Sequence, residues 1–339
     1  MLSYVKWIVS LLCFLNGLFA TSAEIRLQAL ERKLEEMRSQ NGSSRDGMKL
    51  QKRTFERGWV GAELFAGPIY YRATVGGTEY IYRLARGKEK VSSKDFDGDF
   101  GFRVGIGAFL PIVKWEVLGT YTHFGIQDTE GKGEIPPSLL VNLKGGYYVF
   151  SEKVKSTYRI DYDGVDLSLK RSSFIGSVFG LGSSLGAKKV WIHQDQRVSY
   201  TSRENARVWV KDRCCFEGIG PLLGMNLKLN FFWNLSVLGD VKFALLYSDF
   251  QVKHTESPIE MQGEAHLFSP NLSFSFGINK AFPFGAAQGF LTLLYEADYF
   301  FRQNQMVSVG SLKKGSIKIV RSAEDLTFYG IATRIGIEF

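Results

Sequence analysis

A serine between two glycines is the first candidate for chemistry in this chain. Residues 182–186 (GSSLG) match the G-x-S-x-G pattern of a hydrolase nucleophile elbow, with Ser184 as the nucleophile. Three histidines follow it in the chain: His193, His254 and His266. An elbow requires a sharp turn from strand to helix, whereas the flanking residues SVFGLGSSLGAKKVWIHQ continue as a strand. We therefore predict that the protein is not an enzyme.

Acidic residues with metal-ligand spacing are the second candidate. Asp95, Asp97 and Asp99 have the opening spacing of a calcium loop, but Phe100 occupies the position that needs glycine and no Glu follows at the twelfth position. The histidines show neither H-E-x-x-H nor another ligand spacing. The sequence predicts no metal and no cofactor.

Two adjacent cysteines, Cys214 and Cys215, are the third candidate. Neighbouring residues of a strand point to opposite faces, so a disulfide between these two would be strained. In an oxidising compartment they could bridge neighbouring chains or stay reduced.

Charged residues opposite apolar ones form the largest group of candidates. From about Arg57 onward the apolar pattern has period 2, and after the first 23 residues no run of 18 apolar residues occurs. Leu291, Leu293 and Tyr295 share one face, whereas Thr292 and Glu296 share the other. Because acids facing lipid would cost several kcal/mol, we expect the charged face to point inward. The predicted inward charges are Arg103, Lys114, Glu116, Arg159, Asp161, Asp240, Lys242, Glu296, Asp298, Arg302, Arg334 and Glu338.

These inward charges have two explanations. They line a wet channel whose rings of charge set ion preference, or they pair with each other and fill a closed lumen. A barrel of about ten strands encloses a narrow interior, so both explanations stay open.

The strands that position these charges make up an all-β fold. We predict a transmembrane antiparallel β-barrel of about 10–12 strands over residues 57–339. Tight links at 110–113, 230–233 and 279–289 suggest periplasmic turns, and polar links at 72–96, 127–154, 250–263 and 306–322 suggest outer loops. Two of these loops contain strand-like pieces, at 79–84 and 139–150, so twelve strands are also possible. The predicted strands are 59–71, 97–110, 113–126, 155–175, 181–199, 207–230, 233–250, 264–280, 288–306 and 322–339.

The N-terminal region has a different pattern. Residues 1–23 have Lys6, an apolar run and a small-residue exit, as in a cleaved secretory signal peptide. Residues 24–40 predict a short amphipathic periplasmic helix, which needs a partner such as sister helices in a homotrimer. Its a/d seam is Leu27, Leu30, Leu34 and Met37. Residues 41–56 read as a linker.

Two further features concern partners. Residues 324–339 alternate strictly and end at Phe339, resembling the last strand of bacterial outer-membrane barrels, so Phe339 is predicted to be a signal for the barrel assembly machinery. The net charge of +8 is scattered along the chain. It favours outer-membrane lipids and lipopolysaccharide phosphates as partners and does not favour nucleic acid.

Several segments resemble the Legionella-type major outer membrane protein family, which also occurs in chlamydia-related bacteria as MOMP-like proteins. They are DFDGDFGFRVGIGAF (95–109), WEVLGTYTHF (115–124), VWIHQ (190–194), FEGIGPLLGMNL (216–227), LLYSDF (245–250) and YEADYFFRQNQ (295–305). The matching positions include Asp97, Phe102, Arg103, Gly105, Trp191, Gly220, Pro221 and Glu296.

This resemblance implies a surface-exposed outer-membrane barrel, a porin and an abundant antigen, with no catalytic residues. The cysteine-rich pattern of the chlamydial major proteins is absent from the sequence. The function expected is passive diffusion of small hydrophilic solutes. The alternative is a non-conducting adhesin or structural envelope protein that contacts host cells or envelope polysaccharide through its loops.

Overall fold

The computed structural model describes residues 61–85, 88–92, 96–110, 115–133, 139–142, 150–175, 178–202, 207–256, 259–285, 287–313 and 316–339. The predicted signal peptide, the helix with its seam of Leu27, Leu30, Leu34 and Met37, and the linker lie outside these residues. Lys114 and Asp95 lie outside them as well. No helix in the described part of the chain is long and apolar enough to cross a membrane.

Ten antiparallel strands form a closed barrel in the order β1-β14-β13-β12-β11-β10-β9-β8-β5-β4. The first and last strands close it, with Tyr71 opposite Gly330. This confirms the all-β prediction at its lower strand number. The barrel strands are β1 (Gly61–Val75), β4 (Asp99–Leu110), β5 (Trp115–Gly133), β8 (Lys153–Ile175), β9 (Phe179–Thr201), β10 (Arg207–Asn230), β11 (Leu235–Glu256), β12 (Ile259–Phe284), β13 (Ala287–Lys313) and β14 (Ser316–Glu338).

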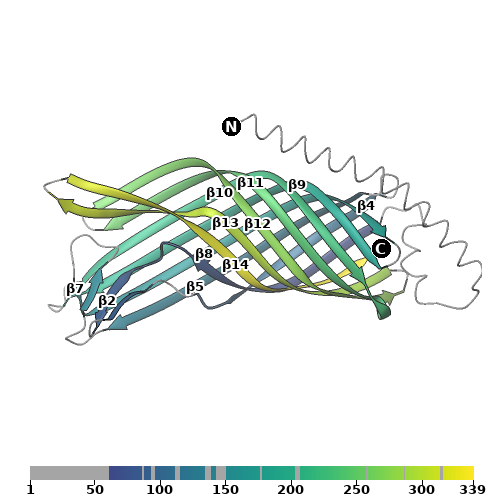
Figure 1. The fold of residues 1–339 in the computed structure, drawn as a ribbon, viewed down its shortest axis with the longest axis horizontal. Helices are drawn as coiled ribbons and strands as arrows, with labels where there is room; N and C mark the ends of the chain where they lie inside the picture. Colours follow the sequence, from purple (N-terminus) through teal and green to yellow (C-terminus); the bar gives the residue numbers. More distant parts are fainter. Residues whose placement is uncertain are drawn as a thin grey trace, which may run out of the picture.

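A separate small sheet explains the strand number. The segments near 79–84 and 139–150, which left twelve strands open, do not join the barrel but pair with each other in the order β3-β2-β6-β7. This sheet lies at one end of the barrel, opposite the C terminus (Figure 1). Its strands are β2 (Ile81–Ala85), β3 (Lys88–Ser92), β6 (Leu139–Asn142) and β7 (Phe150–Ser151).

Several strands are much longer than predicted. The expected outer loops at 250–263 and 306–322 are mostly paired strand, because β11 meets β12 after residue 256 and β13 meets β14 after residue 313. The backbones there pair in register, although beyond Tyr247 the outward positions of β11 are Asp249, Gln251, Lys253 and Thr255, which do not mark a lipid-facing strand in the sequence. We call this end of the barrel the extended end. The other is the short-turn end, which holds the C terminus and the turn with the 3-10 segment η2 (Phe232–Asn234).

Apolar side chains cover the outside of the barrel near the short-turn end. In water so much exposed apolar surface would be unfavourable, and its natural environment is lipid hydrocarbon. This apolar belt includes Leu64, Ile106, Val165, Leu167, Leu169, Leu185, Ile219, Leu223, Val241, Phe243, Leu245, Tyr247, Phe268, Phe274, Phe276, Ile278, Leu291, Leu293, Tyr295, Ile331 and Ile335.

Candidate functional site

The lumen holds charged groups from strands that are not neighbours. Arg103 on β4 donates to both carboxylate oxygens of Glu296 on β13, from Nη1 at 2.8 and 2.7 Å. Its Nε also donates to Thr122 Oγ1 at 2.8 Å. Arg334 Nη2 contacts Glu296 Oε1 at 3.2 Å, and Tyr71 donates its hydroxyl proton to Glu296. Since β4 and β13 are three strands apart in the barrel order, these contacts join separate walls of the lumen.

A second charged cluster crosses the lumen beside the first. Lys188 Nζ on β9 lies 3.4 Å from the carboxylate of Asp298 on β13, four strands away. Asn271 Nδ2 donates to Asp298 Oδ1 at 2.9 Å, and Ser273 donates to the same oxygen. The ammonium of Lys188 also lies over the Phe300 ring, with Nζ 5.5 Å from its centroid. The pair is thus held by hydrogen bonds and by an aromatic ring.

A third cluster lies closer to the short-turn end. Lys242 Nζ contacts Asp166 at 3.9 Å and Asp240 at 3.7 Å, and Lys170 Nζ contacts Glu116 at 3.9 Å. The structure therefore brings most of the predicted inward charges together inside the barrel. They are Arg103, Glu116, Asp240, Lys242, Glu296, Asp298 and Arg334, with Glu338 on the same inward alternation of β14.

Three predicted inward residues lie elsewhere. Arg159 and Asp161 are on the outward face of β8, because the buried residues Tyr158 and Ile160 take the inward positions next to them. This part of β8 lies closer to the extended end than the apolar belt does, so charged side chains on its outer face do not contact hydrocarbon. Arg302 is exposed and has φ 52°. It lies where the pairing register of β13 with β14 shifts, between Phe300 and Asn304, and this shift ends the alternation from which an inward position was predicted.

Some inward groups were missed in the sequence. Lys188, Asp166 and Lys170 all belong to strands where glycine, serine and alanine break the contrast between apolar and polar faces. Alternation along the strand could have found Lys188. It is two and four residues from Val190 and Ile192, which are buried inside the barrel, so it shares their inward face.

Aromatic rings close the lumen above the charged clusters. We call them the aromatic layer: Tyr71, Phe124, Tyr162, Phe216, Phe250, Phe300 and Phe328, all buried. Tyr162 on β8 and Phe300 on β13 have ring centroids 6.2 Å apart. These strands are five places apart in either direction around the ten, so the contact spans the full diameter of the barrel.

Other ring contacts fill the rest of this cross-section. Phe124 stacks on Tyr162 at 4.7 Å and meets Phe328 edge-on at 4.8 Å. Phe216 approaches Phe300 at 6.4 Å. Rings at these separations are in contact, so side chains from opposite walls meet inside the barrel.

The connection after β1 fills the extended end of the lumen. Gln196 Nε2 on β9 donates to the Thr78 carbonyl at 3.3 Å, and the Tyr200 hydroxyl donates to the Tyr80 carbonyl at 2.7 Å. Phe96 packs edge-on against Tyr158 at 5.2 Å. Since β1 and β9 are four strands apart, this segment crosses the opening and makes a second obstruction.

A buried histidine cluster lies inside the barrel at the extended end. His254 Nδ1 is 2.5 Å from Asp212 Oδ1, and His254 Nε2 is 3.9 Å from Glu256 Oε2. Burial acts to lower the pKa of His254, but its hydrogen bonds and attraction to the two carboxylates outweigh burial and raise the pKa to about 9. His254 is seven residues past Tyr247 and so above the apolar belt. The arrangement therefore holds an imidazolium between acids.

The serine motif does not form a nucleophile elbow. Ser184 lies within β9, pairs in register with Gly224, and its strand continues on both sides without a turn. Among the described residues, no group of three or more His, Cys, Asp or Glu side chains could hold a metal ion.

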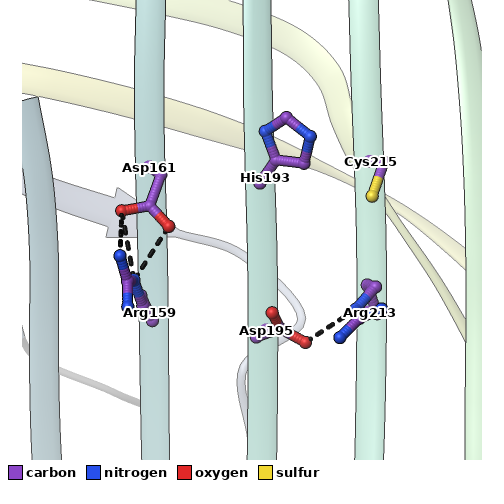
Figure 2. Close-up of a pocket in the computed structure, with 6 residues that line it drawn as sticks. All are labelled: Arg159, Asp161, His193, Asp195, Arg213 and Cys215. Carbon is purple, nitrogen blue, oxygen red and sulfur yellow. Dashed lines mark hydrogen bonds and ion pairs between the residues drawn. The ribbon is translucent and has the colours of Figure 1, made fainter. Parts of the chain in front are cut away.

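The outer wall carries a shallow hollow of about 300 Å³ on β8, β9 and β10 (Figure 2). Arg159 contacts Asp161 through Nε at 2.8 Å and Nη2 at 3.0 Å, and Arg213 Nε contacts Asp195 at 3.0 Å. Cys215 lies beside His193 in this hollow, whereas Cys214 is buried inside the barrel. Neither cysteine forms a disulfide within the described part of the chain, and their opposite orientations agree with the strand geometry expected from the sequence.

A closed ten-stranded barrel with an apolar outer belt and a polar interior is the architecture of an outer-membrane β-barrel protein. The family profile described as Legionella pneumophila major outer membrane protein precursor matches residues 61–339. The chain therefore belongs to this family of outer-membrane proteins, as its sequence motifs suggested.

Solved structures are similar at a low level. The outer membrane protease OmpT from Escherichia coli is 10% identical, with 83% of this chain and 96% of that chain covered and a TM-score of 0.45. The translocator domain of autotransporter NalP from Neisseria meningitidis is 12% identical, with 92% and 96% covered and a TM-score of 0.35. The Pseudomonas putida toluene transporter TodX is 10% identical, with 82% and 89% covered and a TM-score of 0.27. No curated protein sequence matches the chain.

Proposed function

We propose that this outer-membrane protein acts at the cell surface through its extended end and does not provide a wide diffusion channel. The aromatic layer is the observation that carries this proposal, because Tyr162 and Phe300 meet across the full diameter of the lumen. A hydrophilic solute would have to displace these buried rings to pass. This favours the non-conducting surface or structural protein over the general diffusion porin.

The lumen charges support the same proposal. The Arg103–Glu296 and Lys188–Asp298 pairs join strands three and four places apart. Charges that neutralise each other across a lumen hold its walls together, whereas a selective pore needs charge that faces passing ions. The proposed role therefore lies on the outside of the molecule, in contact with the envelope or with host surfaces, and involves no catalysis.

Planar-bilayer recordings of the refolded protein test this proposal. We expect no conductance steps from the native protein, and steps from a Phe300→Ala/Phe328→Ala variant, since both substitutions open the aromatic layer. The control is Phe276→Ala with Leu272→Ala, because both side chains belong to the outward face. Regular conductance steps from the native protein, unchanged in the lumen variant, would contradict the proposal.

A gated porin is the second candidate function. The observation that favours it is water access below the aromatic layer, where the side chains of Asp298 and Asp240 are 24% and 22% exposed. These groups would line a conducting path if the rings moved aside. Voltage-dependent steps in the native protein, with reversal potentials that shift in Asp240→Asn, would support this candidate.

The predicted role of Phe339 in assembly stays a prediction. Its backbone N–H donates to the Ala62 carbonyl at 2.9 Å, so it continues the pairing of the last strand with the first. Its ring is exposed and available to another protein. A homotrimer, host contact and recognition by the barrel assembly machinery are likewise proposals.

A further inference from the structure

The outer wall above the apolar belt carries a concentrated group of cations on four neighbouring strands. Two adjacent rows of register partners cross β8, β9, β10 and β11 there. The first row is Arg159, Asp195, Arg213 and Lys253, and the second is Thr157, Arg197, Lys211 and Thr255. We call these eight residues the cationic block. Five of them are cations and only Asp195 is an anion.

Nearby carboxylates do not cancel this charge. Asp195 is shared, at 3.0 Å from Arg213 Nε and 3.6 Å from Lys211 Nζ. Beyond the block, Asp161 pairs with Arg159, and Glu260 on β12 pairs with Lys253 at 2.5 Å. Counting both, three carboxylates face five cations. The side chains of Arg159 and Arg213 remain 59% and 47% exposed, so they are available to a further anion.

The position of the block relative to lipid follows from the strands. The top row of the apolar belt on these strands includes Val165, Ile219 and Tyr247. Lys189 on β9 is the register partner of both Val165 and Ile219, so it lies in the same row. Lys189 lies over the ring of Trp191, with Nζ 4.5 Å from the centroid, as expected of side chains at a membrane interface. Arg159 is six residues past Val165, which places it about 15 Å above the belt at ~3.3 Å per residue and ~40° tilt.

We propose that the cationic block binds the phosphate groups of lipopolysaccharide, with the extended end of the barrel facing outward. The block lies above the apolar belt on the same strands, so the molecules that stand beside it are those whose acyl chains contact the belt. In the outer leaflet these carry phosphates on lipid A and on the core sugars above it. Guanidinium groups bind phosphate through paired hydrogen bonds. Arg159 and Arg213 line one hollow of the outer wall together with Asp161 and Asp195 (Figure 2).

The height of the block decides between phosphate sources. Lipid A phosphates lie at the hydrocarbon edge, beside Lys189, where the next outward row contains the acids Asp163, Glu217 and Asp249. Core phosphates lie further out, level with the cations. The proposal is therefore specific for the core region. It depends on the outer-membrane location and not on the closed lumen, so conductance results leave it unaffected.

Binding of fluorescent lipopolysaccharide to the full chain in detergent tests this proposal. The block variant is Arg159→Gln/Arg197→Gln/Arg213→Gln. The control variant, Arg72→Gln/Arg171→Gln/Lys280→Gln, removes three exposed cations from elsewhere on the barrel. We expect the block variant to bind full-core lipopolysaccharide about tenfold or more weakly, because three charge-assisted contacts are lost. The control variant should bind like the native protein.

Two further probes make the result specific. Native protein should bind full-core lipopolysaccharide more tightly than lipid A without core, and the block variant should lose this difference. Equal binding of full-core lipopolysaccharide by native and block variants would overturn the proposal. It would also be overturned if the block substitutions weakened only heparin binding, which would indicate a surface for sulfated host glycans. Heat-modifiable gel mobility verifies that each variant is folded.

Discussion

At the residue scale, Glu296 is the centre of the lumen contacts. It accepts hydrogen bonds from Arg103 and Tyr71 and contacts Arg334, which lie on three other strands. Because these groups are largely shielded from water, removal of the single anion leaves two cations without their partner. A buried charge without its partner costs more than the pair contributes.

We therefore expect Glu296→Gln to destabilise the barrel by about 3–5 kcal/mol. Unfolding in urea, followed by heat-modifiable mobility, measures the change. Glu217→Gln is the matched control, since Glu217 pairs with Lys189 at 2.9 Å on the exposed wall and such pairs contribute less than ~1 kcal/mol. Equal effects of the two substitutions would show that the lumen contacts do not hold the walls.

His254 gives a second prediction at this scale. Its pKa is about 9 in the barrel against an ordinary value of 6.5, so the folded state binds the proton more tightly. The stabilisation is complete below the ordinary value and declines as the pH rises through about 9; by linkage it is worth roughly 3 kcal/mol at most. The free energy of unfolding, measured from pH 6 to 10, should fall, and His254→Gln should flatten this part of the profile. A native profile that rises over this range would contradict the assignment.

The alternation of inward and outward side chains along a strand explains which residues could be predicted. Glu296 and Asp298 were placed correctly because they alternate with large apolar residues that must face lipid. Arg159 was misplaced because its stretch of β8 lies above the lipid, where charge does not reveal the inward face. Cross-lumen partners, such as Lys188 for Asp298, depend on barrel closure and shear, which no local pattern contains.

At the scale of elements, the strands were predictable where they cross lipid and not beyond it. Apolar alternation identified the lower part of β11, whereas above Tyr247 its outward positions are polar: Asp249, Gln251, Lys253 and Thr255. Only pairing with the neighbouring strand distinguishes such segments from loops. The sequence does indicate strand-like pieces at 79–84 and 139–150, but no local pattern shows that they pair with each other outside the barrel.

The pairing of β10 with β11 gives the prediction at this scale. The pairing is interrupted between the partners Ile219–Tyr247 and Leu222–Ala244. Pro221 lies in this interruption and has no N–H to donate to the neighbouring strand. A Cβ on Gly220 would lie 1.9 Å from the Leu245 carbonyl oxygen. Gly220→Val should therefore force the strands apart and destabilise the barrel by about 3 kcal/mol or more.

The control for Gly220→Val is the same substitution in β12, two strands away from β10. A Cβ on Gly263 in β12 meets no atom within 4 Å, so Gly263→Val should change the free energy of unfolding by less than about 0.5 kcal/mol. The folded fraction after refolding, read from heat-modifiable mobility, compares the two variants. Equal folded fractions would mean that the strands do not approach as closely as described.

At the scale of the whole molecule, the orientation of the barrel decides which surface faces the outside. The long strands and the small sheet extend from one end, whereas the short turns and the C terminus lie at the other (Figure 1). Both proposals place the extended end outside the cell. Cys214 and Cys215 can test this, because they are adjacent in the extended half and face opposite sides of its wall.

We expect a membrane-impermeant maleimide to label Cys215 on intact cells. The Cys214→Ser variant should label like the native protein, and Cys215→Ser should not label, since Cys214 is buried in the lumen. Burial raises the pKa of the Cys215 thiol; Arg213 lowers this pKa and Asp195 raises it, and the net effect is a rise. Because the thiolate is the reactive form, labelling should be slow at neutral pH and faster toward about pH 9. The Cys214→Ser/Cys215→Ser variant gives the background labelling, because its one remaining cysteine is Cys13 in the predicted signal peptide. If Cys215 reacts only after the outer membrane is permeabilised, the extended end faces the periplasm and the cationic block cannot contact lipopolysaccharide.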